Sequence, residues 1–222
     1  MAIILNIDCS QESASVGIAR DGDCLATRSN HLQTDHASWI HTAILELVTE
    51  TGIQLTNTDA IAVTSGPGSY TGLRVGMATA KGLCYALHKP LICIPTLEMM
   101  AYAARNTSAT LICPMIDARR MEVYAAIYDK ELNELVSPEA VILEPTTYHS
   151  YITAHTVCFT GSGSKKLQGL VNDTHAKFEE YPFSVTDMSA IALKKFHLQD
   201  FASLAYTEPL YIKEFYTTGR RN

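Results

Sequence analysis

Two aspartates stand where carboxylates often do chemistry, at the end of a strand that the sequence predicts to be buried. Asp8 follows the apolar run at residues 2–7, and Asp117 follows the apolar run at residues 111–116. A carboxylate there can hold a metal ion or activate water, and it can equally cap a turn through its side chain. Gly161 and Gly163 lack the Cβ atom that would keep a ribose or adenine ring away. The candidate nucleotide-binding residues are therefore Asp8, Ser10, Asp117, Arg119, Gly161 and Gly163.

A glycine-rich loop joins a predicted strand at residues 59–64 to a predicted helix at residues 71–88. It reads Ser-Gly-Pro-Gly-Ser-Tyr-Thr-Gly from Ser65 to Gly72. Backbone N–H groups at the start of the helix are able to hold an anion. The spacing differs from G-x-x-x-x-G-K-S/T, which excludes a Walker phosphate-binding loop.

The helix after this loop carries small residues in two rows that lie on different faces. Small residues at every fourth position let another helix approach closely. We expect one row to pack inside its own lobe, and the presence of a second row indicates contact with another protein. The two rows are Gly72, Gly76 and Ala80, and Ala78, Gly82 and Ala86.

The elements that must position these residues occur twice along the chain. Each half predicts three strands, a helix and a further strand that ends in glycine-rich sequence. Two βββαβα lobes facing a cleft form the architecture of the actin, sugar-kinase and Hsp70 ATPase (ASKHA) superfamily. We therefore expect a duplicated α/β fold with lobes at residues 1–106 and 107–222, the last segment being free to pack back on the first lobe. The helix with the clearest period of apolar residues lies at residues 38–51.

Composition narrows the classes of function. The 222 residues include 17 basic and 23 acidic side chains, and the net charge of −6 argues against autonomous binding of nucleic acid. No apolar run approaches the roughly 18 residues of a membrane span, and no basic leader precedes the first strand, so we expect a cytoplasmic protein. The six cysteines are far apart without a C-x-x-C pair, which predicts reduced core residues.

Three segments resemble signatures of the TsaB (YeaZ) family, and the likeness extends over nearly the whole chain. They are the loop and helix start at residues 65–76, the stretch Ile116 to Arg119 with the following Glu-Val-Tyr, and residues 209–212. Cys9 departs from the family, which more often has threonine there. The resemblance implies a non-catalytic subunit of bacterial tRNA threonylcarbamoyladenosine modification that pairs with the TsaD transferase. It also implies a ternary complex with the TsaE ATPase, contact with tRNA only through the complex, and homodimers when the partner is missing.

The resemblance also bears on metals and cofactors. The related TsaD transferase carries two histidines four residues apart on a helix, where one turn lets both imidazoles face one metal. Thr96 and Met100 occupy the matching positions here, so we expect no metal site. We expect no cofactor of its own, and two alternatives stay open: weak ATP or ADP binding by this chain, or a nucleotide at the partner interface.

We predict that the helices at residues 38–51 and 71–88 form the partner surface, because both lie near the glycine-rich loop and offer apolar or small faces. An enzyme is the alternative, namely a small-molecule kinase of the same superfamily that uses Asp8 or Asp117 with magnesium. A chain of 222 residues leaves little room for a sugar-binding insertion, which weighs against it. The predicted interface residues are Trp39, Thr42, Leu45, Thr71, Gly72, Val75, Gly76, Thr79, Ala80 and Leu83.

Overall fold

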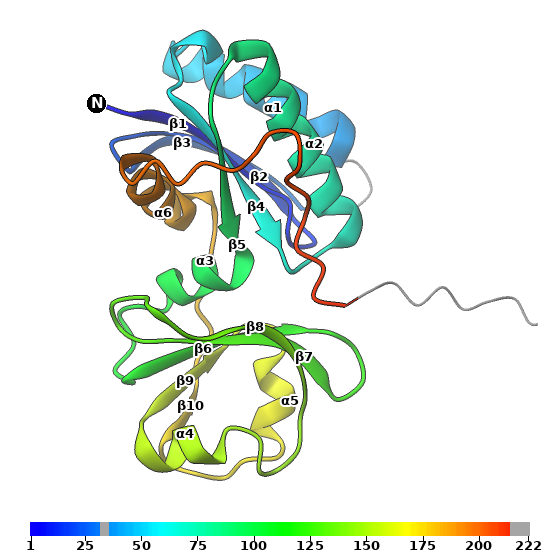
Figure 1. The fold of residues 1–222 in the computed structure, drawn as a ribbon, viewed down its shortest axis with the longest axis vertical. Coiled ribbons are helices and arrows are strands. Elements are labelled where there is room, and N and C mark those ends of the chain that lie inside the picture. Colours follow the sequence, from blue (N-terminus) through cyan, green and yellow to red (C-terminus); the bar gives the residue numbers. More distant parts are fainter. Residues whose placement is uncertain (32–35, 214–222) are drawn as a thin grey trace, which may run out of the picture.

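The computed structural model describes residues 1–31 and 36–213, and in it two five-stranded sheets stand one above the other (Figure 1). The first sheet has the strand order β3-β2-β1-β4-β5. Its first three strands form an antiparallel meander, and β4 and β5 continue parallel to β1. Its strands are β1 (Ile3–Asp8), β2 (Ala14–Arg20), β3 (Asp23–Asn30), β4 (Ala60–Gly66) and β5 (Leu91–Pro95).

The second sheet repeats the plan of the first. Its strand order, counted from the outer meander strand, is β8-β7-β6-β9-β10, with an antiparallel meander followed by two parallel strands. This identity of order and direction confirms the predicted duplication of an α/β lobe. The strands are β6 (Leu111–Asp117), β7 (Glu122–Tyr128), β8 (Glu134–Ile142), β9 (Val157–Thr160) and β10 (Ala176–Phe178).

Helices cover both faces of the first sheet. The helices α1 (His36–Thr51) and α2 (Tyr70–Leu87) pack on one face, and α6 (Val185–His197) packs on the other (Figure 1). Since neighbouring residues of a strand point to opposite faces, Leu5 joins the core under α1 and α2, whereas Ile4 joins the core under α6. Burial on both sides explains why the strand reads as one apolar run.

A short helix, α3 (Thr96–Ala103), connects the lobes and is buried against the second sheet. Leu97 and Met100 of α3 pack with Ile112 and Tyr128 of that sheet. The opposite face of the second sheet is covered by α4 (His149–Ala154) and α5 (Ser164–Gln168), while a 3-10 turn, η1 (Leu55–Asn57), precedes β4. Among the helices of residues 1–31 and 36–213, none is long and apolar enough to cross a membrane.

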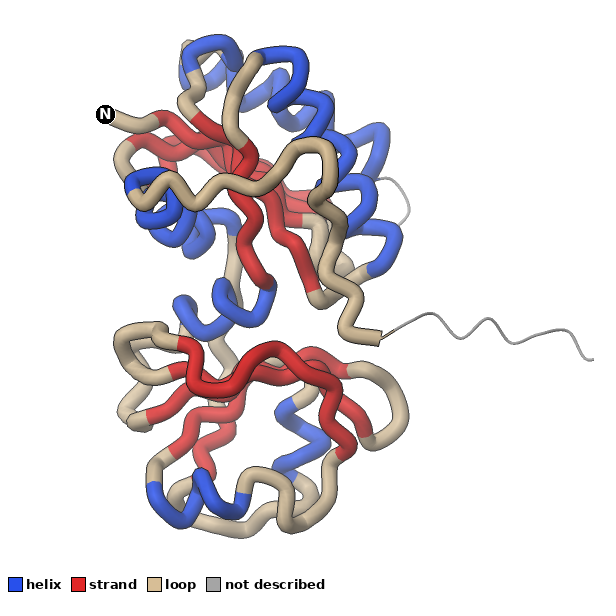
Figure 2. The backbone as a smooth tube through the Cα atoms, in the orientation of Figure 1, coloured by secondary structure: helices blue, strands red, loops and turns tan. Residues whose placement is uncertain are grey.

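The chain returns to the first lobe after the second sheet is complete. Helix α6 begins in a capping box, in which Ser184 and Asp187 satisfy each other's backbone N–H groups. Residues 198–213, here called the C-terminal strap, then cross the first lobe without regular secondary structure (Figure 2). The backbone N–H of Ala202 donates to the Leu91 carbonyl at 2.8 Å, and that of Leu210 donates to the Ser65 carbonyl at 2.7 Å. Helix α6 and the strap follow the predicted boundary at residue 106 in the sequence, but they pack on the first lobe.

Candidate functional site

A cleft of about 1130 Å³ separates the lobes. The first lobe lines it with the hairpin after β1 and with Gly68 and Ser69 in the middle of the glycine-rich loop. The second lobe lines it with the ends of β6 and β9. Tyr124, Tyr181 and Phe183 give its wall an aromatic component. Of the predicted nucleotide-binding residues, the cleft is lined by Ser10, Asp117, Arg119 and Gly161.

Asp8 lies inside the first lobe and caps the turn after β1. Its side chain is 1% exposed. The carboxylate oxygen Oδ1 accepts hydrogen bonds from the Ser10 N–H at 2.9 Å, the Ser10 hydroxyl at 2.7 Å and the Thr64 hydroxyl at 2.9 Å. The turn already uses this oxygen and Asp8 does not line the cleft, so these contacts give Asp8 a structural role, and its part in nucleotide binding stays a prediction.

The environment of Asp8 gives a test of this structural role. Burial raises the pKa of Asp8 above its ordinary value of 3.8, despite the hydrogen bonds from Ser10 and Thr64. The folded protein therefore binds this proton more readily than the unfolded chain, so the contribution of Asp8 to stability falls as pH rises above 3.8. We expect Asp8→Asn, whose amide oxygen can accept the same bonds, to raise the free energy of unfolding at pH 7. Near pH 3.8 the difference should vanish.

Urea denaturation across this pH range measures the effect, and Asp117→Asn is the matched control. A hydrogen bond from Lys166 lowers the pKa of Asp117, so its stabilisation is present at neutral pH and is lost on acidification. At pH 7, Asp8→Asn should therefore be more stable than the parent, and Asp117→Asn should be less stable. An Asp8→Asn protein that is less stable than the parent at pH 7 would show that the carboxylate charge itself is needed.

Asp117 faces the cleft, but its charge is already compensated. Lys166 Nζ lies 2.7 Å from Asp117 Oδ1, and the same oxygen accepts the backbone N–H of Arg119 at 2.6 Å. Lys166 also donates to the Glu122 carbonyl at 3.0 Å, which fixes the lysine in place. The arrangement holds the β6–β7 turn together and leaves Arg119 and Arg120 as exposed cations of this hairpin.

Gly161 and Gly163, which follow β9, lie in close contact with other residues of the chain. A Cβ atom on Gly161 would lie 2.2 Å from Met100 Cε, and one on Gly163 would lie 2.7 Å from Val123 Cγ1. Gly163 does not line the cleft, and its part in nucleotide binding stays a prediction. Met100, at one of the two positions predicted to lack a metal-binding histidine, fills the space beside Gly161. Within the described residues, no group of three or more His, Cys, Asp or Glu side chains is arranged to hold a metal ion.

The start of α2 is covered by the hairpin after β1. The Ser69 N–H donates to the Ser10 carbonyl at 2.7 Å, and the Ser69 hydroxyl accepts the Gly72 N–H at 3.3 Å. A Cβ atom on Gly68 would lie 2.2 Å from that same Ser10 oxygen. Two N–H groups at the helix start therefore bind the chain's own carbonyl and side-chain oxygens, and anion binding there stays a prediction.

The first row of small residues on α2 faces the sheet below it. A Cβ atom on Gly72 would lie 2.1 Å from the Cys9 carbonyl oxygen. The Cβ position of Gly76 is 3.3 Å from Cys9 Cβ and 3.5 Å from Val63 Cγ2. The small residues let α2 lie directly on β1 and β4, so the row is intramolecular. The predicted partner contacts by Gly72, Gly76, Thr79 and Ala80 are wrong, because these residues are buried within the lobe.

The second row lies on the exposed side of α2. Among the described residues, no atom of another element lies within 4 Å of the Cβ position of Gly82, and Tyr85 is 76% exposed. Exposed and half-buried residues recur here at intervals of four and three, which places them along one stripe of the helix. This stripe, the α2 seam, consists of Thr71, Val75, Ala78, Gly82, Tyr85 and Ala86.

Helix α1 adds a second exposed stripe on the same side of the sheet. Thr42 and Thr49 are exposed and Leu45 is 63% exposed, although leucine is normally buried. Of the other predicted interface residues, Trp39 and Leu83 are half-buried and pack partly against the core beneath the helices. The α2 seam and this α1 stripe of Thr42, Leu45 and Thr49 are together called the docking face. Ala78, Gly82, Tyr85 and Ala86 were absent from the predicted interface, although the spacing of the second row marked three of them.

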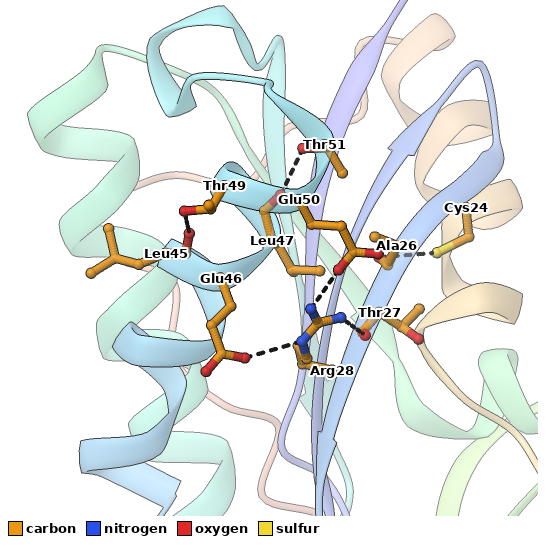
Figure 3. A network of polar contacts seen from close by, with 10 residues as sticks. All are labelled: Cys24, Ala26, Thr27, Arg28, Leu45, Glu46, Leu47, Thr49, Glu50 and Thr51. Carbon is orange, nitrogen blue, oxygen red and sulfur yellow. Dashed lines mark hydrogen bonds and ion pairs between the residues drawn. The ribbon is translucent and has the colours of Figure 1, made fainter.

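A cluster of charged side chains links β3 to α1 beside that stripe (Figure 3). Arg28 of β3 donates from Nε to Glu46 at 3.0 Å, forms a second ion pair with Glu50, and donates to the Thr27 carbonyl at 2.9 Å. Figure 3 shows Leu45 on the side of α1 that points away from Arg28. The helix therefore buries its apolar residues Ile40, Ala43, Ile44 and Leu47 against the sheet, and its outer surface presents Leu45 between two threonines, beside the charged cluster.

Two lobes with one topology, joined by a connecting helix and facing a cleft, define the two-lobed fold of the ASKHA superfamily. A family model described as TsaD, tRNA N6-adenosine threonylcarbamoyltransferase, matches residues 30–212. The chain is 31% identical to the tRNA threonylcarbamoyladenosine biosynthesis protein TsaB of Escherichia coli K12, over 95% of this chain and 94% of that protein. The chain therefore belongs to the family that the TsaD model describes and, within it, to the TsaB (YeaZ) family.

Solved structures agree with this assignment. YeaZ from Pseudomonas aeruginosa matches with a TM-score of 0.80 and 25% sequence identity, covering 95% of this chain and 100% of that one. A second P. aeruginosa structure, of an uncharacterized protein with similarity to peptidase YEAZ, gives a TM-score of 0.85 at 25% identity. It covers 96% of this chain and 100% of that one. Both matches therefore extend over nearly the whole chain.

Proposed function

We propose that this chain is a non-catalytic subunit of the bacterial machinery that makes threonylcarbamoyladenosine in tRNA, and that it binds the TsaD transferase through its docking face. The exposed row of small residues on α2 carries the proposal. Small residues at every fourth position let another helix approach closely, and Tyr85 stands exposed beside this row. The lobe's own core is already closed by the buried row, so the exposed row is available to a partner.

The chemistry is assigned to TsaD because this chain keeps its candidate reactive groups for its own structure. Asp8 caps a turn, Asp117 is paired with Lys166, and Met100 packs on Gly161. A kinase would need a free carboxylate for magnesium or for the acceptor hydroxyl, which makes that alternative less favoured. The net charge of −6 supports contact with tRNA only through the complex.

The remaining parts of the proposal follow the family. The TsaE ATPase joins the two proteins in a ternary complex in the cytoplasm, and the docking face supports a homodimer when TsaD is missing. The chain has no cofactor of its own. Nucleotide, where present, is held weakly by the cleft residues Ser10, Asp117, Arg119 and Gly161, or at the interface with the partner.

Co-expression with TsaD of the same organism tests the proposal. Size-exclusion chromatography with light scattering should show a one-to-one heterodimer, and neither protein alone should modify tRNA efficiently when supplied with threonylcarbamoyl-adenylate and TsaE. Adding this chain should restore the activity of TsaD. Proteins that elute separately, or a lone chain that transfers the threonylcarbamoyl group, would refute the assignment.

A further inference from the structure

Arg74 lies on the exposed side of α2, and two tyrosines fix its side chain. Its Nε donates to the Tyr211 hydroxyl at 3.0 Å, and its Cζ lies 4.0 Å from the centre of the Tyr70 ring. The two rings have their centres 5.3 Å apart, and the Tyr211 ring centre is 5.9 Å from Arg74 Cζ. Stacking on one ring and bonding to the other hydroxyl orient a side chain that would otherwise sample many rotamers.

The strap holds Tyr211 in position relative to α2. The neighbouring residue Leu210 donates its N–H to Ser65 at 2.7 Å, and Lys81 Nζ donates to the Thr207 carbonyl at 3.0 Å. Gly66 has a φ of +110°, and a Cβ there would lie 2.9 Å from the Leu210 carbonyl oxygen. The glycine-rich loop thus accommodates the strap directly, and through Tyr211 the strap controls the orientation of Arg74.

Only one edge of the guanidinium is used by these contacts. Within the part of the chain that the structure describes, Arg74 has a hydrogen bond at Nε, and no hydrogen bond or ion pair from either terminal nitrogen is present. The hydrogen bond to Tyr211 raises the pKa of Arg74, and the negative charge of Glu208 in the strap raises it by a smaller amount. A guanidinium with its two forked nitrogens free matches the two oxygens of a carboxylate.

We propose that Arg74 is the polar anchor of the docking face, that it receives a carboxylate of the partner protein, and that Tyr211 is its positioning residue. This inference rests on the proposed function and adds the strap to the interface. The neighbours of Arg74 along the helix are Thr71, Val75 and Ala78, which suit a protein surface. An RNA backbone would call for further cations beside it, because affinity for phosphates comes from several basic side chains together.

The test measures the affinity of the full chain for purified TsaD by calorimetry or biolayer interferometry. Arg74→Gln should weaken binding about 10- to 100-fold, since it removes one partner of a charge-assisted pair. Arg74→Lys, which keeps the charge and loses the fork, should recover only part of the loss. Tyr211→Phe should weaken binding about 3- to 10-fold in the parent protein and should have no further effect in the Arg74→Gln background, as expected for action through Arg74.

Lys177→Gln, on β10 at the far side of the second lobe, is the control for loss of one positive charge. Unchanged thermal stability of each variant shows that the fold is intact. If Arg74→Gln binds TsaD as tightly as the parent while variants of the α2 seam fail to bind, Arg74 is not the polar anchor. The proposed function is then unaffected. If Arg74→Gln lowers only the affinity of the assembled complex for tRNA, the ligand is a phosphate and the proposal is wrong. If seam variants also bind normally, the proposed function itself fails.

Discussion

Gly72→Ala should lower the free energy of unfolding by about 2–4 kcal/mol, at or above the usual cost of overpacking a core. The added Cβ would lie 2.1 Å from the Cys9 carbonyl oxygen, so one backbone would press on another. No side-chain rotation relieves such a contact, and α2 would have to move away from β1. Chemical denaturation, followed by circular dichroism, measures the change.

Gly82→Ala, ten residues further along the same helix, is the matched control. Its Cβ meets no atom within 4 Å, so only helix propensity changes, and alanine should add about 0.5–1 kcal/mol of stability. The two identical substitutions should therefore have opposite signs. Equal effects at both positions would mean that α2 does not rest on β1 in the way described.

Gly82→Leu should weaken the affinity for TsaD about 5- to 150-fold while leaving the isolated chain at least as stable as the parent. A leucine in the α2 seam adds four carbons where a partner helix axis would approach to about 8–10 Å, and overpacking of that size costs about 1–3 kcal/mol. Titration with TsaD gives the affinity, and a thermal melt gives the stability. Gly82→Ala should bind with little change, because alanine already occurs elsewhere in the seam.

Gly76→Leu provides the comparison from the buried row. The space beside it is occupied by Cys9 and Val63, so the melting temperature should fall by about 2–8 °C. Retained binding by Gly82→Leu would remove the α2 seam from the interface. A Gly76→Leu protein with parent-like stability that no longer binds TsaD would restore the interface first predicted from the sequence.

The fold was largely predictable from the sequence because local signals agreed with it. Two α/β lobes were predicted from the apolar runs before Asp8 and Asp117, the apolar period of α1 and the repeated order of elements. The predicted ends of α1 and α2 lie within two residues of the observed ones. Helix α6 was missed, although its capping box at Ser184 and the apolar residues Val185, Met188 and Ile191 signal it. Its docking on the first sheet is a long-range contact that no local pattern reveals.

The candidate site was less predictable, because spacing does not say which face of an element points inward. Both small rows of α2 satisfy the same rule, and only the sheet beneath shows that Gly76 is buried and Gly82 exposed. Asp8 and Asp117 share a position in their lobes, yet one is enclosed by Ser10 and Thr64 and the other meets Lys166. The pairing of Arg74 with Tyr211 joins residues 137 positions apart, which is beyond any sequence motif.

The return of α6 to the first sheet has a consequence for synthesis on the ribosome. The second lobe is inserted between α3 and α6, so its strands are all made before the first lobe can finish its core. Until α6 emerges, the core around Ile4 and Ile92 lacks Met188 and Ile191, and of the helices that cover it only α3, through Met99, has been made. The lobe that is translated first is therefore the lobe that completes its core last, and Arg74 gains its contact with Tyr211 only once the strap has been made.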